Sequence, residues 1–321
     1  MSELLKSIDA RTRLAGTNKL EILLFSLGVD NRTGRRETFG INVFKVREVM
    51  RTPAITAAPE MPSSVEGMVS LRGVLVPVVD LAKYAGMNCD TPREIMIVTE
   101  YNGHTQGFLV EAVDTILRLD WSMMRVPPDM LSGNLGGLVT AVTELEGNRL
   151  VMMLDVEKVL SETSRYDDDF LFKDIEQQFQ QDATVFFADD SSVARKQIIR
   201  ALDAMGVRHF GAVNGRVAWE ELKKVAAHAD SSGKRVRDLV QIVLTDVEMP
   251  EMDGYILTRM IKSDPRFDGV RVVMHSSLSG MSNQQLGQSV GVDEYVPKFE
   301  PQRLCETLAR LIRGSKSPAA A

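Results

Sequence analysis

The strongest constraint on the fold is the alternation of short apolar runs with amphipathic segments in the C-terminal part of the chain. Five runs have the length of strands: Ala183–Ala188, a weaker one at Val207–Ala212, Leu239–Thr245, Val270–His275 and Val292–Val296. After the first run, Ala194, Ile198, Ala201, Leu202 and Met205 recur at helical spacing. Strands that alternate with helices form parallel sheets. The pattern therefore predicts five βα units in a doubly wound α/β domain.

Polar side chains follow or end four of these predicted strands. Asp189 and Asp190 come after the first strand, Asp246 after the third, Ser276 after the fourth and Lys298 after the fifth. Ligands of doubly wound sheets bind at the carboxyl ends of the strands. We therefore expect three carboxylates, a hydroxyl and an amine to converge at one edge of the sheet.

This set of groups suits phosphoryl transfer. Clustered carboxylates repel one another and need a cation, for which Mg²⁺ with its oxygen ligands is the natural choice. A carboxylate can accept a phosphoryl group as an acyl phosphate, while Mg²⁺ neutralises the phosphoryl oxygens. Lys298 would add a positive charge and Ser276 a hydrogen bond. Each residue alone has an ordinary alternative: Asp189 or Asp190 as a helix N-cap, Asp246 as a turn residue, and Lys298 as a solvated lysine.

Residues 183–313 resemble a response-regulator receiver domain, the flavodoxin-like (βα)5 fold of the chemotaxis regulator CheY. The resemblance rests on the acidic pair, on Ser276, on Leu244–Gly254 with the sequence LTDVEMPEMDG, and on Gly291–Lys298 with the sequence GVDEYVPK. It implies that a histidine kinase phosphorylates Asp246. It also assigns roles to other residues: Mg²⁺ binding by Asp189, Asp190, Asp246 and the backbone carbonyl of Glu248, phosphoryl contact by Lys298, and a switch pair of Ser276 and Tyr295.

Three features depart from the receiver pattern. Phe299 follows Lys298 where the family has proline after a cis bond, and the acidic Glu248 lies beside the site, where it would affect the lifetime of the phosphate. The stretch Ala229–Asp238 resembles an insertion before the third strand, and we predict a surface loop there.

The preceding part of the chain, from about Leu20 to Leu160, is rich in short strands and turns. We predict strands at Leu20–Leu27, Thr38–Val43, Val74–Val79, Ile95–Thr99, Gln106–Ala112, Leu138–Thr143 and Leu150–Leu154. Asn102-Gly103 predicts a hairpin turn, since both residues tolerate positive φ. The pattern indicates an all-β domain or a pair of small barrels.

This β-rich part resembles the chemotaxis scaffold CheW, chiefly over Phe39–Val49 and Val65–Leu81, with Ser70 where the family usually has asparagine. The resemblance implies two five-stranded barrels. It also implies that one surface binds chemoreceptors and another binds the histidine kinase CheA, with CheW-like proteins of the same array as further partners. Val46, Glu48 and Arg72 match positions implicated in these contacts, although Arg72-Gly73 could equally serve the turn between two strands.

Composition excludes several classes of protein. With 38 Lys and Arg against 44 Asp and Glu, the net charge of −6 argues against a nucleic-acid partner. Two cysteines provide no disulfide framework and fit a reducing cytoplasm. The N-terminus does not resemble a secretory signal, and no apolar run is long enough to cross a bilayer. We therefore expect a cytoplasmic protein beside membrane-bound receptor arrays.

The 321 residues divide into five predicted segments: a helical segment at 1–19, the coupling domain at 20–160, a linker at 161–182, the receiver at 183–313 and a tail at 314–321. The linker includes a short amphipathic helix at Asp174–Gln181 and is either a solvated tether or a docked segment. No DNA-binding domain is expected after the receiver.

This order of domains resembles the CheV-type chemotaxis coupling proteins. The resemblance implies an adaptor that links chemoreceptors to CheA and is tuned by phosphorylation of Asp246, for adaptation. Two alternatives remain. One is a phosphate sink that drains phosphoryl groups from CheA. The other is a Mg²⁺-dependent aspartyl-phosphate phosphatase, although such enzymes have a second aspartate where Glu248 stands. Which receptors are bound, and whether phosphorylation strengthens or weakens coupling, does not follow from the sequence.

Overall fold

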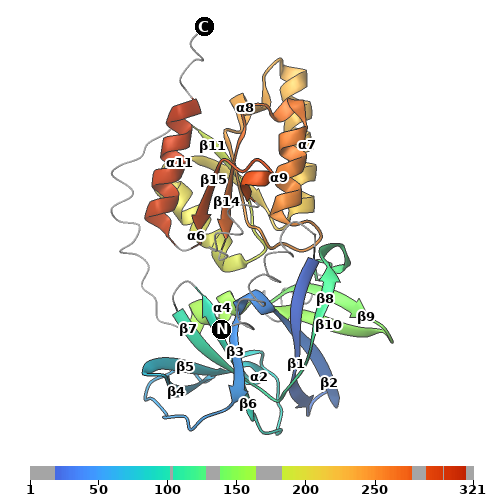
Figure 1. Ribbon diagram of the computed structural model, residues 1–321, viewed down its shortest axis with the longest axis vertical. Helices are drawn as coiled ribbons and strands as arrows, with labels where there is room; N and C mark the ends of the chain where they lie inside the picture. Colours follow the sequence, from blue (N-terminus) through green and yellow to red (C-terminus); the bar gives the residue numbers. More distant parts are fainter. Residues whose placement is uncertain are drawn as a thin grey trace. The chain divides into compact units, whose positions relative to one another are not determined.

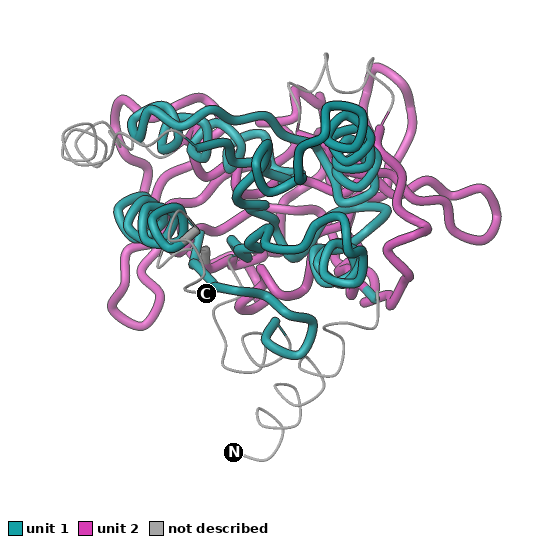
Figure 2. Tube along the Cα trace, turned by 90° about the horizontal axis from the view of Figure 1, so that it is seen from above, with its two compact units in different colours: residues 1–19, 167–321 teal, residues 20–166 magenta. Residues whose placement is uncertain are grey.

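The structure, a computed structural model, describes residues 19–101, 104–127, 138–163, 183–276, 287–298 and 300–315. The chain divides into two compact units: residues 20–166 form one, and residues 167–321 together with 1–19 form the other (Figure 2). The predicted N-terminal helix, the linker helix at 174–181, the turn at Asn102-Gly103 and residue Phe299 lie outside the described residues.

The unit of residues 20–166 contains two five-stranded sheets (Figure 1). One has the order β8-β1-β2-β10-β9, with bounds β1 Lys19–Asp30, β2 Arg35–Asn42, β8 Ala112–Asp120, β9 Val139–Leu145 and β10 Arg149–Leu154. The other has the order β3-β6-β7-β5-β4, with bounds β3 Val46–Arg51, β4 Val65–Leu71, β5 Val74–Asp80, β6 Ile95–Tyr101 and β7 His104–Val110. Short helical elements lie between successive strands: η1 Val43–Lys45, α2 Leu81–Tyr84 and η2 Trp121–Met123. The predicted all-β domain with two five-stranded parts is thereby confirmed.

A shared apolar core joins the two sheets of this unit. Phe25 and Phe39 from one sheet and Ile97 and Phe108 from the other are buried in the same cluster. Helix α4, Val156–Thr163, adds Val156 and Val159 to this cluster and runs into the predicted linker. Full burial of a large apolar side chain stabilises the fold by about 1.5–3 kcal/mol. The two sheets are therefore held together as one domain.

Three strands of this unit, β3, β4 and β8, are not among the predicted strand ranges, although the turn at Arg72-Gly73 implied a strand where β4 lies. Exposed or half-buried side chains interrupt all three, and β3 strictly alternates between half-buried and exposed residues. None of these strands has a continuous apolar run, and the apolar and polar residues of β3, VREVMR, do not alternate along the sequence, so the sequence signal of these strands is weak. Their backbone pairing with neighbouring strands defines them instead.

The unit that includes residues 167–321 contains a five-stranded parallel sheet of order β12-β11-β13-β14-β15. Its strands are β11 Thr184–Ala188, β12 Arg208–Ala212, β13 Ile242–Thr245, β14 Arg271–Ser276 and β15 Glu294–Pro297. Its described helices are α6 Ser192–Ala204, α7 Gly215–Ser232, α8 Val236–Leu239, α9 Gly254–Ser263, η3 Pro265–Phe267 and α11 Pro301–Ser315. One apolar cluster contains residues of α6 and α11, and another contains residues of α7 and α9. The helices therefore cover both faces of the sheet (Figure 1), and the predicted doubly wound fold is confirmed.

The predicted surface loop at Ala229–Asp238 is wrong. Helix α7 continues to Ser232 and ends at Gly233, whose φ of 66° gives a left-handed C-cap, and α8 begins at Val236. The reason is packing, because Ala229 and Val236 are buried in the apolar cluster beneath α7. Strand β13 accordingly starts at Ile242, later than the predicted Leu239.

Candidate functional site

Strand register brings the predicted site residues to one edge of the parallel sheet. Ala188 pairs with Thr245, and Thr245 pairs with Met274, so the residues that follow these strands leave the sheet side by side. Ser276, at the end of β14, pairs with Pro297, which directly precedes Lys298. The convergence expected from four separate strand ends is therefore present.

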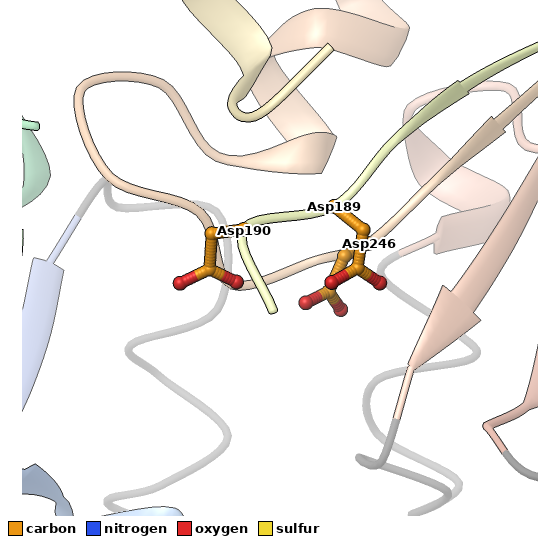
Figure 3. Close-up of side chains that lie close together, drawn as sticks. All are labelled: Asp189, Asp190 and Asp246. Carbon is orange, nitrogen blue, oxygen red and sulfur yellow. The ribbon is translucent and has the colours of Figure 1, made fainter. Parts of the chain in front are cut away.

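Three carboxylates form the centre of the site. Oxygen atoms of Asp189, Asp190 and Asp246 lie within 4.8 Å of one another (Figure 3). Asp189 is fully buried, Asp246 is 5% exposed and Asp190 is half-buried. Burying negative charges so close together is costly unless cations compensate them. The cluster offers the hard oxygen ligands that Mg²⁺ prefers, so its donor set fits that ion.

Lys298 supplies part of the compensating charge. Its Nζ lies 2.7 Å from Asp246 Oδ2 and 2.8 Å from Asp189 Oδ2, and its side chain is only 2% exposed. One ammonium group balances one of the three carboxylates. The negative charge that remains favours a further cation at this edge of the sheet.

Backbone amides hold the second oxygen of the two buried carboxylates. The Val247 N–H donates to Asp246 Oδ1 at 2.6 Å, and the Ser191 N–H donates to Asp189 Oδ1 at 2.9 Å. The helix N-cap is Ser191, whose hydroxyl accepts from the Ala194 N–H, so neither aspartate of the pair caps helix α6. The ordinary alternative for Asp189 and Asp190 is thereby wrong.

Arg195, which was not predicted, fixes the backbone of the acidic pair. Its Nη1 donates to the carbonyl oxygens of Asp189 and Asp190, both at 2.8 Å. The guanidinium group extends from the second turn of α6 back to the strand end. The signal in the sequence is limited to the position of Arg195 in the predicted helix that follows Asp189 and Asp190.

Gly254 allows residues 246–253, called the acceptor loop after the predicted role of Asp246, to fold closely over their own start. Its N–H donates to the Val247 carbonyl at 2.9 Å, and a Cβ atom at this position would lie 2.0 Å from the carbonyl oxygen of Asp246. Helix α9 begins at Gly254 with Asp253 as its N-cap. A side chain at residue 254 would therefore displace the backbone of Asp246.

Ser276 and Tyr295 are joined by a hydrogen bond between their hydroxyl groups. Ser276 is buried, whereas Tyr295 is half-buried and packs against a small apolar cluster that includes Tyr255 and Met274. Burial raises the pKa of the Tyr295 phenol, the bond from Ser276 opposes that shift, and the Asp246 carboxylate adds to it. The Asp246 carboxylate therefore lies close enough to Tyr295 to disfavour ionisation of its phenol.

Two further residues modify the surroundings of this pair. The carboxylate of Glu248, two residues after Asp246, raises the pKa of both Tyr255 and Tyr295, behind burial as the main cause. Tyr255 is almost fully buried and was not predicted. Its place at the start of α9, under Tyr295, follows from the fold rather than from a motif.

The residues predicted to bind partners lie in the other unit. Glu48 on β3 and Arg72 form an ion pair of 2.8 Å, and the Arg72 side chain is 73% exposed. Arg72 has a φ of 52° in the turn between β4 and β5, so it serves the turn as well. Val46 is half-buried and packs on the shared core.

Comparison with known families identifies the class of protein. The CheW-like domain matches residues 22–164, and the response regulator receiver domain matches residues 185–309. The chain is thus a two-domain signalling protein of the CheV type, in which a CheW-like domain precedes a receiver. Among the described residues, no helix is both long enough and apolar enough to cross a membrane.

Individual relatives agree with this class. The chain is 28% identical over 300 residues to the chemotaxis protein CheV3 of Helicobacter pylori, covering 92% of this chain and 95% of that one. It is 31% identical over 154 residues to the chemotaxis protein CheW of Klebsiella aerogenes, covering 47% and 87%. The crystal structure of the scaffolding protein TtCheW from Thermoanaerobacter tengcongensis matches 42% of this chain and 88% of its own, at 27% identity and a TM-score of 0.38. The protein is a chemotaxis coupling adaptor with a phosphorylatable receiver domain.

Proposed function

We propose that Asp246 is the phosphoacceptor of this adaptor and that its phosphorylation tunes the coupling of chemoreceptors to the kinase CheA. The observation that carries the proposal is the buried contact of Lys298 with both Asp189 and Asp246 at the edge of the sheet. This contact supports the proposal because phosphoryl transfer needs a nucleophilic carboxylate beside a fixed cation, and Lys298 contacts Asp246 directly.

The transfer uses groups already in position. A carboxylate oxygen of Asp246 attacks the phosphorus atom, the bond between phosphorus and the donor nitrogen of the kinase histidine breaks, and the electron pair stays on that nitrogen. The ammonium of Lys298 then leaves the Asp246 carboxylate and pairs with a phosphoryl oxygen. The Ser276 hydroxyl donates a hydrogen bond to a second phosphoryl oxygen. Mg²⁺, held by Asp189, Asp190, Asp246 and the Glu248 carbonyl, would neutralise phosphoryl oxygens. Loss of the phosphoryl group to water would reset the site.

Ser276 and Tyr295 provide the response. When the Ser276 hydroxyl donates to a phosphoryl oxygen, its bond with Tyr295 is lost, and the phenol can repack against the cluster that contains Tyr255. The signal is a shift of population between the two arrangements, which requires that the phosphoryl group favour one of them.

Labelling with phosphorylated CheA tests the acceptor. The parent chain should acquire a phosphoryl group that is hydrolysed in acid and in base and is released by hydroxylamine, as acyl phosphates are, and Asp246→Ala should acquire none. Asp268→Ala is a matched control, because Asp268 is an exposed aspartate of the same unit, away from the sheet edge. Equal labelling of Asp246→Ala and the parent would refute the assignment.

The partners we propose are CheA, chemoreceptors and CheW-like proteins in membrane-associated arrays, contacted by the surface around Val46, Glu48 and Arg72. The support is the exposed ion pair of Glu48 with Arg72 on the CheW-like domain. Arg72→Ala should reduce co-sedimentation with receptor arrays. Arg118→Ala is the control, since Arg118 forms a comparable exposed pair with Glu21 on the other sheet. Equal losses for both variants would contradict this surface.

A phosphate sink uses the same acceptor chemistry but predicts no change in coupling. The two functions are separated by measuring CheA activity in arrays while Asp246 is phosphorylated. Phosphatase activity toward free phosphomonoesters is a remoter alternative, and turnover of a generic substrate by the purified chain would support it.

A further inference from the structure

The acceptor loop contains a residue whose backbone conformation is rare for residues with a side chain. Glu251, five residues after Asp246, has a φ of 67°, in the left-handed region that residues with side chains rarely adopt. The Met252 N–H donates to the Pro250 carbonyl at 2.8 Å across this residue, so the loop turns tightly there. Such a conformation persists where surrounding contacts enforce it.

The contacts come from the start of helix α7, which lies beside α9 (Figure 1). The Arg216 Nε donates to Glu251 Oε2 at 2.5 Å, and the Asn214 Nδ2 donates to the same oxygen at 3.3 Å. Asn214 is fully buried and also caps α7, because its Oδ1 accepts from the Val217 N–H. The Glu251 carboxylate is therefore held by a rigid, capped helix end.

The backbone of the loop also touches this helix end. A Cβ atom on Gly215 would lie 2.4 Å from the carbonyl oxygen of Met252. At the other end of the loop, Gly254 packs directly against the carbonyl oxygen of Asp246. The acceptor loop is thus fixed between α7 and α9, and the ion pair of Arg216 with Glu251 spans 35 residues of sequence.

We infer that Glu251 is a positioning residue for phosphorylation: held by Arg216 and Asn214, it keeps the acceptor loop folded so that Asp246 and the backbone of Glu248 face the acidic pair. This rests on the proposed role of Asp246 as phosphoacceptor. Glu251 does not act on the phosphoryl group itself. It acts through the loop that carries Asp246, and small displacements of a reacting group slow a reaction strongly.

Three substitutions at residue 251 separate positioning from plain stability. Glu251→Gln keeps an oxygen acceptor for Arg216 and Asn214, so the phosphorylation rate should stay near that of the parent. Glu251→Ala removes the acceptor, and the rate should fall by at least about threefold. Glu251→Gly also removes the acceptor but adopts the positive φ without strain. It should therefore be at least as stable as the alanine variant, yet as slow.

The measurement is the rate at which the full-length chain is phosphorylated by acetyl phosphate with Mg²⁺, beside the thermal unfolding midpoint of each variant. Arg216→Ala should reproduce the loss seen for Glu251→Ala, and the double variant should be no slower than either. Arg216 is 60% exposed, so its removal tests the contact even where a loop variant fails to fold. Lys224→Ala, which breaks the exposed pair with Glu221 on the same helix, should leave the rate unchanged.

Two results would overturn the inference. In the first, Glu251→Ala and Arg216→Ala are both phosphorylated as fast as the parent. In the second, Glu251→Ala is slower than the parent, but Glu251→Gly is as fast as the parent. The second would mean that only backbone conformation matters. Either result counts only if the parent is phosphorylated and Asp246→Ala is not. If Asp246→Ala is labelled as well as the parent, the acceptor assignment has failed instead, and the two failures are thereby distinguished.

Discussion

The geometry of Asp246 depends on a neighbouring residue that has no side chain. Gly254 brings the start of α9 against the carbonyl of Asp246, while the Thr245 hydroxyl donates to that same carbonyl at 2.9 Å. The oxygens of the carboxylate are meanwhile held by Val247 and Lys298. Each of these contacts restricts where the acceptor oxygens can lie.

Gly254→Ala should therefore impair both stability and phosphorylation. The added methyl group meets backbone rather than a movable side chain, and overpacking of this kind costs about 1–3 kcal/mol. Urea denaturation and the acetyl phosphate reaction measure the two effects. Gly314→Ala is the control, because a Cβ there meets open space in α11. A Gly254→Ala variant as stable and as reactive as the parent would contradict the close approach.

Lys298→Met should destabilise the receiver by about 3 kcal/mol, because it leaves Asp189 and Asp246 buried without their cation. Since Mg²⁺ would replace the missing charge, millimolar Mg²⁺ should raise the unfolding midpoint more in this variant than in the parent. Thermal unfolding with and without Mg²⁺ measures the difference. An unfolding midpoint that Mg²⁺ changes in neither protein would argue against a cation site at these carboxylates.

At the scale of elements, Asp293 joins the far end of the receiver sheet to α9. Its carboxylate accepts hydrogen bonds from Lys262 of α9 at 2.6 Å, Arg271 of β14 at 2.7 Å and the Val272 N–H at 2.8 Å. Burial alone would raise the pKa of Asp293, but these three donors hold it below its usual value. The ionised form is thus the one that the fold favours.

The stabilisation by Asp293 should depend on pH in a defined direction. A lowered pKa means that the contribution is present above the pKa of the unfolded chain, about 3.9, and is lost as pH falls through the lower folded value. The stability gap between the parent and Asp293→Asn should be widest at neutral pH and narrow as pH falls below about 5. Urea denaturation at several pH values measures it. A gap that widens on acidification would contradict the lowered pKa.

Some contacts between elements could be predicted from the sequence and others could not. Asp189, Asp246, Ser276 and Lys298 were predictable because parallel strands bring their carboxyl ends to one edge, whatever the details of packing. The bond of Glu251 to Arg216 was not, because nothing local signals a contact across 35 residues. The helical residues at 229–232 and 236–239 were also missed, since buried Ala229 and Val236 determine these helices through tertiary packing.

At the scale of the whole molecule, two units with separate cores share one chain. The receiver contains the acidic cluster with Lys298, and the CheW-like domain presents the exposed pair of Glu48 with Arg72. A phosphoryl group can alter coupling only if it has different free energies in two states of the protein. Phosphorylation of the receiver must therefore change the equilibrium between two states of the CheW-like domain if it is to alter coupling.

The most direct test is CheA activity in reconstituted receptor arrays that contain the adaptor, measured with and without phosphorylation of Asp246. Phosphorylation of the parent should change CheA activity by at least about twofold. Arrays with Asp246→Ala should keep one activity under both conditions. An unchanged activity, while Asp246 of the parent is shown to be phosphorylated, would contradict the claim and leave the receiver as a phosphate sink.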